Sequence, residues 1–186
     1  MKQISEQILY QGKTKKGNDL VIRYINKKDA ENQLNFINLI SQEKTYVIFQ
    51  GEQLTLEEEQ KYVDSKVEGI LNNKSIFLLA LIDNKIVGSS SIDMDGNVSS
   101  HVGSFGIIVS KSCRGEGIGN ILLKTVLKEA KAKLINLKIV VLSVFSNNPI
   151  AQKLYLKNGF KEYGILPKGI KHRNKFVDSI LMYKNI

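Results

Sequence analysis

The spacing of apolar residues in the first half of the chain predicts a strand followed by two helices. Residues 20–25 alternate between apolar and polar positions and are rich in branched side chains, which is typical of a strand. Residues 4–10 are a candidate partner strand across a turn at residues 12–18. Asn26 can then cap a helix whose apolar face continues to about Ser41.

A second helix is predicted to start at Thr55. Thr-Leu-Glu-Glu at this point fits a capping box, with Glu58 at the third helical position, and apolar residues repeat at helical spacing as far as Leu71. We interpret the acidic run at residues 57–59 as favourable charge at a helix N-terminus, rather than as a catalytic or metal-binding cluster.

The second half of the chain alternates strands and helices. Residues 75–82 and 85–94 predict a hairpin, and the later predicted strands are residues 99–109, 139–145, 160–166 and 176–183. Helices are predicted from Gly117 to about Leu134 and from Pro149 to Asn158. The last two strands would enclose a basic loop at residues 167–175.

Composition favours one domain over residues 1–186. The chain is 42% hydrophobic and 24% charged, and its single cysteine, Cys113, excludes a disulfide scaffold. No structural zinc site can be built from Cys113 with His101 and His172. The longest apolar run is too short for a membrane helix and residues 1–11 lack the apolar core of a signal peptide, so we expect a cytoplasmic protein without membrane contact.

Charge is divided unevenly along the chain. The net charge is +9, but residues 1–110 contain 12 basic and 14 acidic residues, whereas residues 111–186 contain 15 and 4. A basic half is typical of proteins that bind an anion, either nucleic acid or a phosphorylated small molecule. The alternative is that the lysines simply cover solvated faces.

A glycine-rich segment lies between the predicted strand ending at Val109 and the helix near Gly117. Its sequence is Arg114-Gly115-Glu116-Gly117-Ile118-Gly119. Glycines let successive N–H groups point at one spot, and a helix N-terminus adds partial positive charge there, so the segment can hold an anion. It is neither a P-loop nor a dinucleotide fingerprint, and a purely structural turn is the alternative interpretation.

Two motifs in their order and spacing resemble the GNAT superfamily of acyl-coenzyme A dependent N-acyltransferases. The first is Arg/Gln-x-x-Gly-x-Gly/Ala after a hydrophobic strand end, matched by Arg114, Gly117 and Gly119 behind residues 107–109. The second, Asn-x-x-Ala-x-x-Leu-Tyr followed by Gly-Phe, is matched by Asn148, Ala151, Leu154, Tyr155, Gly159 and Phe160. Cys113 departs from the bulky residue usual in relatives.

The resemblance implies an α/β (α+β) fold, with a mixed, largely antiparallel sheet of six or seven strands and about four flanking helices. A coenzyme cleft would open between the strands ending near Val109 and Phe145. The implied reaction is direct transfer of an acetyl group from acetyl-coenzyme A, the co-substrate, to a primary amine of a small molecule or peptide, without a metal. A homodimer is one candidate assembly.

The resemblance also assigns residues to these tasks. Tyr155 would protonate the departing thiolate, and Glu43 would help form the acceptor pocket. Coenzyme A would bind to the strand end, the glycine segment and Asn148: Ile107, Ile108, Val109, Arg114, Gly115, Glu116, Gly117, Ile118, Gly119 and Asn148. The backbone N–H near Val109 would polarise the thioester carbonyl.

Several alternatives stay open at this level. The base that deprotonates the amine is unresolved among Glu43, Asp93, Asp95, His101 and a chain of water molecules. Cys113 as an acyl-carrying nucleophile is disfavoured, because no histidine is near it in sequence. A silent acetyl-coenzyme A sensor and a nucleic-acid binder are the rival functions, although no nucleic-acid signature is present and the chain has no Trp.

Overall fold

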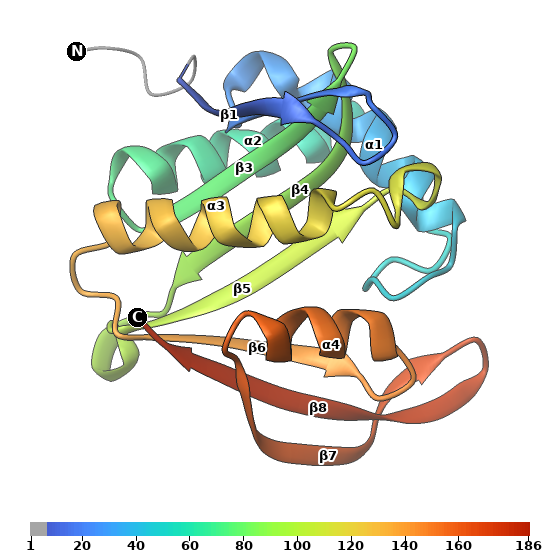
Figure 1. Ribbon diagram of the computed structural model, residues 1–186, viewed down its shortest axis with the longest axis vertical. Helices are drawn as coiled ribbons and strands as arrows, with labels where there is room; N and C mark the ends of the chain where they lie inside the picture. Colours follow the sequence, from blue (N-terminus) through green and yellow to red (C-terminus); the bar gives the residue numbers. More distant parts are fainter. Residues whose placement is uncertain (1–6) are drawn as a thin grey trace. The chain divides into compact units, whose positions relative to one another are not determined.

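The computed structural model describes residues 7–186, which form two compact units (Figure 1). The first unit comprises the chain up to Asp93 together with Gly106–Ile135, and the second comprises Met94–Phe105 with Asn136–Ile186. The strands are hydrogen-bonded in the order β1-β2-β3-β4-β5-β6-β8-β7, and β5 (Val102–Val109) contributes to both units. The prediction of a single domain covering the chain stays a prediction.

The first unit is built on antiparallel strands with helices on both faces. Its elements are β1 (Ile8–Lys13), β2 (Asp19–Tyr24), η2 (Lys27–Asp29), α1 (Ala30–Gln42), α2 (Leu56–Leu71), β3 (Ser75–Ile82), β4 (Lys85–Met94), η4 (Lys111–Cys113) and α3 (Ile118–Lys133). Tyr62 of α2 packs edge-on against Phe77 of β3. Leu122 of α3 approaches Gly88 of β4 on the other face, and Figure 1 shows α3 in front of these strands and α2 behind them.

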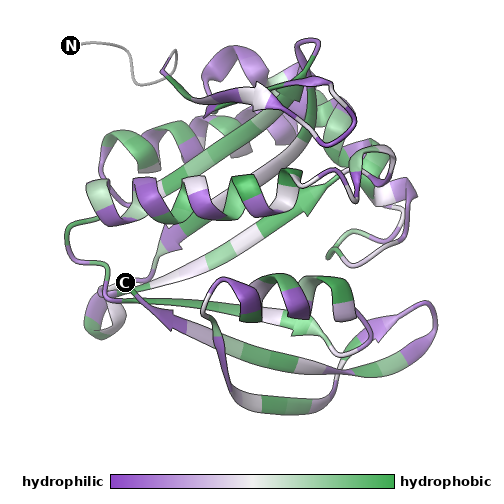
Figure 2. Ribbon diagram, viewed as in Figure 1, coloured by the Kyte–Doolittle hydropathy of each residue, from purple (hydrophilic) through white to green (hydrophobic). Residues whose placement is uncertain are grey.

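Local sequence signals explain where these helices begin. Thr55 and Glu58 form the predicted capping box of α2, and Asn26 caps η2 immediately before α1. The strand β3 is buried over nearly its whole length, and its residues are accordingly apolar without interruption. In Figure 2 the helix α3 instead shows alternating hydrophobic and hydrophilic bands, because only one side of it faces the core. The apolar side of α3 packs inward and its lysines face solvent.

The second unit contains η3 (Asn97–Ser99), the start of β5, β6 (Ile139–Phe145), α4 (Pro149–Lys157), β7 (Lys161–His172) and β8 (Lys175–Asn185). The parallel ladder between β5 and β6 joins Val102–Ser104 to 139–141, at the beginning of both strands. Antiparallel β8 then pairs along the whole of β6. The mixed, mostly antiparallel sheet and four helices confirm the predicted fold class.

Two details of the prediction were wrong. The described chain has eight strands rather than six or seven; residues 4–6 of the proposed partner strand lie outside the described residues, while β1 extends to Lys13. The segment 167–175 is not a loop, because β7 continues to His172 and the turn consists of Arg173 and Asn174. A register shift after Leu166 accommodates the intervening proline, which is tolerated at a bulge in this edge strand.

Candidate functional site

The glycine segment forms an open backbone cradle at the start of α3. Gly115 and Gly117 have φ of +81° and +88°, in the left-handed region that favours glycine, and Gly117 is the N-cap of α3. No side chain caps this helix end, so it lacks the side-chain acceptor that commonly satisfies the first N–H groups of a helix. A Cβ built on Gly115 would meet no atom within 4 Å. The cradle therefore fits an anionic phosphate group.

Arg114 contacts the nearby end of β5 and also two residues, Glu43 and Thr45, from a remote part of the first unit. Its Nε donates to the Val109 carbonyl at 2.9 Å, and its terminal nitrogens lie 2.6 Å from a carboxylate oxygen of Glu43 and 3.4 Å from the Thr45 hydroxyl. The other oxygen of Glu43 accepts from the backbone N–H of Lys111 at 2.9 Å. The carboxylate of Glu43 thus bonds both to Arg114 of the glycine segment and to the backbone just before it.

Glu116 faces inward, toward the turn between β1 and β2. Its side chain is 3% exposed, lies 3.1 Å from the Lys16 ammonium, and accepts from Asn18 at 3.4 Å. The backbone N–H of Lys15 donates to the Glu116 carbonyl at 3.1 Å. The Thr14 hydroxyl and the Lys16 ammonium beside it lower the pKa of this carboxyl, which therefore stays ionised. The turn supports the cradle from outside the motif.

Lys15 is the cation of this turn that the sequence analysis missed. Its Cε and Cγ lie 3.8 and 3.9 Å from the position that a Cβ on Gly117 would occupy. Lys13 and Lys16 are paired with Asp19 and Glu116, whereas no acidic side chain of residues 7–186 forms an ion pair with the exposed Lys15. No sequence motif could have found it, because Lys15 and Gly117 are far apart along the chain.

The strand end that precedes the cradle is tightly held. Residues 107–109 are half-buried, and Ser110 donates its backbone N–H to the Val87 carbonyl at 2.9 Å. A Cβ on Gly88 would lie 2.9 Å from the Ile108 carbonyl oxygen, so glycine permits the close approach of β4 to β5. Ile118 is buried, so only its backbone can face a ligand. Cys113 lies half-buried in η4.

The second family motif lies in the second unit, on α4. Asn148 caps this helix by accepting from the Ala151 N–H at 3.2 Å. Tyr155 is buried, with its ring 5.9 Å from Phe105 and 5.8 Å from Phe160. Burial raises the pKa of the Tyr155 phenol to about 12, so the hydroxyl keeps its proton at neutral pH.

The remaining candidate bases have other partners. Asp93 pairs with Lys66 at 2.7 Å, and Asp95 accepts from Ser104 at 3.4 Å. His101 is exposed, and its backbone carbonyl accepts from Lys138 at 2.8 Å. The geometry does not select a base among these three residues.

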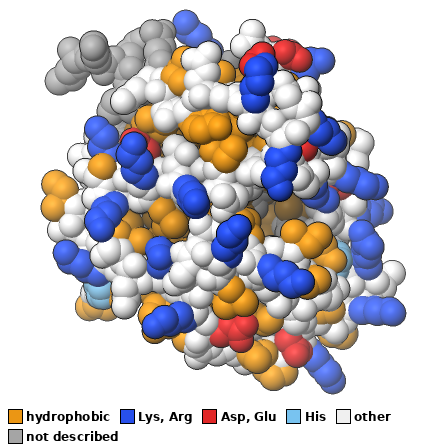
Figure 3. Space-filling model, in the orientation of Figure 1, with side chains coloured by type: hydrophobic (Ala, Val, Ile, Leu, Met, Phe, Trp, Pro, Cys, Tyr) orange, Lys and Arg blue, Asp and Glu red, His pale blue; other side chains and the backbone are white. Residues whose placement is uncertain are grey.

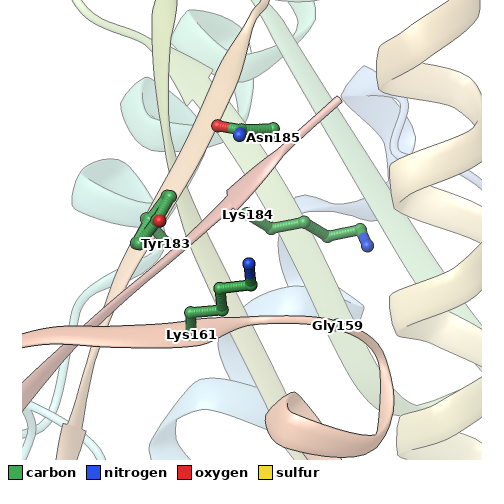
Figure 4. Close-up of a pocket in the computed structure, with 5 residues that line it drawn as sticks. All are labelled: Gly159, Lys161, Tyr183, Lys184 and Asn185. Atoms are coloured by element: carbon green, nitrogen blue, oxygen red, sulfur yellow. The ribbon is translucent and has the colours of Figure 1, made fainter.

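Two hollows occur in the second unit. One has a volume of about 350 Å³ and lies where the β5–β6 ladder ends. The residues that line it are Ser104, Phe105, Val141, Leu142, Ser143, Tyr163 and Leu181. The other, of about 150 Å³, lies beside Gly159, and Figure 4 shows the side chains of Lys161 and Lys184 around it. The first adjoins Phe105, which contacts Tyr155, and is the better candidate for an acceptor group.

The described part of the chain contains no group of three His, Cys, Asp or Glu side chains placed to hold a metal ion. Within the same residues, no helix is long and apolar enough to cross a membrane. Lys and Arg side chains are spread across the face seen in Figure 3.

Comparison with known proteins decides the family. The sequence model of the acetyltransferase (GNAT) family matches residues 36–160, which include the cradle and both motifs. The chain belongs to this family. A structure of a GNAT-family acetyltransferase from Streptococcus pneumoniae is 31% identical, with a TM-score of 0.82, and the match covers 90% of this chain and 99% of that one.

Two curated relatives match over a shorter region. An uncharacterised N-acetyltransferase of Methanocaldococcus jannaschii is 38% identical over 109 residues, which are 58% of this chain and 65% of that protein. The L-amino acid N-acetyltransferase AaaT of Escherichia coli is 31% identical over 106 residues, 56% of this chain and 65% of that protein. The chain thus spans about 65% of the length of these relatives.

Proposed function

We propose that this GNAT protein is an N-acetyltransferase that moves an acetyl group from acetyl-coenzyme A directly to a primary amine. The observation that carries the proposal is the uncapped start of α3 behind two left-handed glycines, with Arg114 and Lys15 beside it. These groups fit the pyrophosphate of coenzyme A, because N–H donors, a helix N-terminus and cations all favour phosphate.

The bound coenzyme would supply an acetyl group activated as a thioester, and residues of this chain would do the rest. Backbone N–H groups of the cradle hold the phosphates, and Asn148 bonds the pantetheine arm. The Val109 N–H polarises the carbonyl that the amine attacks. Tyr155, with its raised pKa, holds a proton that it can give to the thiolate.

We assign Glu43 to the cradle in preference to the acceptor pocket. The support is its double engagement, with the Arg114 guanidinium and the Lys111 N–H. The acceptor would then bind elsewhere, and the hollow next to Phe105 is our candidate for its binding site.

The acceptor class that we propose is an α-amino group, in an amino acid or at a peptide N-terminus. The support is the name of the E. coli relative, an L-amino acid N-acetyltransferase. A cytoplasmic location and a homodimer stay predictions. Exposed apolar residues along the hairpin of β7 and β8, Tyr163, Ile165, Leu166 and Phe176, favour such a dimer.

The test is an assay of free thiol with acetyl-coenzyme A and a panel of amino acids, amino-acid amides and peptides. Thiol release that requires the amine supports the proposed activity. Binding of acetyl-coenzyme A without thiol release for any amine would favour the silent sensor. Binding to DNA or RNA with a steep salt dependence would favour the nucleic-acid alternative.

A further inference from the structure

The hollow next to Phe105 opens on the more exposed face of β6 and β8. Along β6, buried residues alternate with the half-buried Val141 and the exposed Ser143, so these two side chains project from the face opposite the core. Leu181 of β8 pairs directly with Ser143 and therefore projects from the same face. All three residues line the hollow.

Tyr163 closes one side of the hollow because of an irregularity in β7. The pairing of β7 with β8 shifts between Glu162 and Gly164, so Tyr163 is an extra residue at a bulge, and bulges change the direction in which a side chain points. Its ring meets the ring of Tyr183 edge-on at 5.9 Å, and Tyr183 lies opposite Val141. The Tyr163 ring thus lines the hollow although 57% of the residue is exposed.

The lining of the hollow contains no Asp, Glu, His, Lys or Arg side chain. Its polar side chains are hydroxyl groups, and the hydroxyl of Ser104 donates to the carboxylate of Asp95 at 3.4 Å, which lies outside the lining. A charged side chain that entered the hollow would lose hydration without gaining an ion pair from the lining. An apolar side chain would instead bury its surface against the aromatic and aliphatic groups.

The size of the hollow also restricts the ligand. Its volume of about 350 Å³ corresponds to about ten water molecules, at roughly 30 Å³ each. A side chain as large as that of leucine, methionine or phenylalanine displaces much of this water, whereas the methyl group of alanine leaves most of it in place.

We infer that this hollow binds the side chain of the acceptor, and that the acceptor is an α-amino compound whose side chain at the reacting end is large and apolar. Tyr163 and Leu181 determine this specificity, because they supply the side wall and part of the floor. The inference rests on the proposed function, in which the acceptor offers an α-amino group.

The experiment measures kcat/KM from thiol release with L-amino acids and with their amides, in two series that differ only in the side chain. Each series contains leucine, methionine, phenylalanine, alanine, arginine and glutamic acid. We expect the best of the first three to exceed alanine by at least about tenfold, because one methylene in an apolar pocket already changes kcat/KM by about that factor. Arginine and glutamic acid should lie at least about tenfold below the same substrate, because the lining does not compensate their charge.

Substitution of Tyr163 tests the assignment to this hollow. Tyr163→Ala should reduce the preference for the best apolar acceptor over alanine by at least about fivefold, whereas Tyr163→Phe, which keeps the ring, should retain the preference. Ile165→Ala is the matched control, because Ile165 is equally exposed on the same strand but does not line the hollow. A loss caused by a weakened dimer would affect this control as well. The unfolding temperature of each variant shows whether it is folded.

Three results would overturn the inference while acetyl transfer itself stands. They are equal rates for all side chains, a preference for arginine or glutamic acid, and an apolar preference that Tyr163→Ala leaves intact. Failure of the proposed function has a different signature: no acceptor of either series, and no other amine, would release thiol from acetyl-coenzyme A, and the inference would fall with it.

Discussion

The guanidinium of Arg114 lies 2.6 Å from the carboxylate of Glu43, in the segment between α1 and α2. Arg114 begins the family motif, while Glu43 is 71 residues earlier in the chain. The Glu43 side chain is largely shielded from solvent, with 11% of its surface exposed. Glu43, which the sequence analysis assigned to the acceptor pocket, thus contacts the first residue of the glycine segment.

Glu43→Gln is expected to weaken acetyl-coenzyme A binding without changing the KM of the acceptor. The variant removes an ion pair in which Arg114 remains 40% exposed, so we expect a loss of about 1 kcal/mol, or about fivefold in affinity. Calorimetric titration and initial rates measure the two quantities. Glu68→Gln, at an exposed position of α2, is the control. An acceptor KM that rises while cofactor affinity stays constant would restore Glu43 to the acceptor pocket.

Lys15→Ala is expected to weaken acetyl-coenzyme A binding about tenfold, because it removes one cation beside the helix N-terminus. Acetyl-pantetheine, which has no phosphate, should bind the wild type and the variant equally. Lys13→Ala is the matched control, since Lys13 lies on the same hairpin but pairs with Asp19. Equal losses for both ligands would mean that Lys15 supports the fold of the hairpin and not the phosphates.

Gly117→Val is expected to abolish the stabilisation that acetyl-coenzyme A gives the wild type. Its φ of +88° disfavours any side chain, and a branched one would cover the N–H groups of the cradle. Ligand at a hundredfold excess over Kd should stabilise the wild type by about 2.7 kcal/mol.

The control for this experiment is Gly96→Val, at a loop position where an added Cβ meets nothing within 4 Å. Thermal unfolding is followed with and without the coenzyme in all three proteins. An undiminished shift in Gly117→Val would place the coenzyme elsewhere on the molecule.

Local signals in the sequence were sufficient for most of the fold. The Thr55 capping box, the Asn148 cap and the turn at Asp83 and Asn84 all depend on side chains and backbone within a few residues. The end of the β7–β8 hairpin was missed because a bulge near Lys168, with φ of +53°, lets the pairing resume after the proline. No short-range rule encodes that resumption.

The candidate site was predictable only where it coincides with a motif. Arg114, Gly117 and Tyr155 follow from the resemblance, but the partners of the cradle, Lys15 and Glu43, come from remote segments. The burial of Glu59 also had a usable signal, because Glu59 shares the helical spacing of the buried residues on α2. The sequence analysis grouped it with its exposed neighbours through charge, and so missed its burial.

Tyr155→Phe is expected to leave acetyl-coenzyme A binding intact and to lower kcat by about 100-fold, because it deletes the donated proton but keeps the ring. The ring packs against Phe105 and Phe160, so the free energy of unfolding should change little. A smaller loss in kcat is expected where thiolate departure does not limit the rate. Tyr10→Phe, on β1 in the other unit, is the control.

The pH dependence separates an acid from a packing residue. Because burial raises the pKa of Tyr155 to about 12, the phenol stays protonated and able to donate throughout the range of the assay. The ratio of kcat between wild type and Tyr155→Phe should therefore be constant from about pH 6 to about pH 10, whereas an unshifted phenol near ~10 would begin to lose its proton and narrow the ratio. A ratio of one across this range would show that Tyr155 serves packing alone, and the proton for the thiolate would then have to come from water.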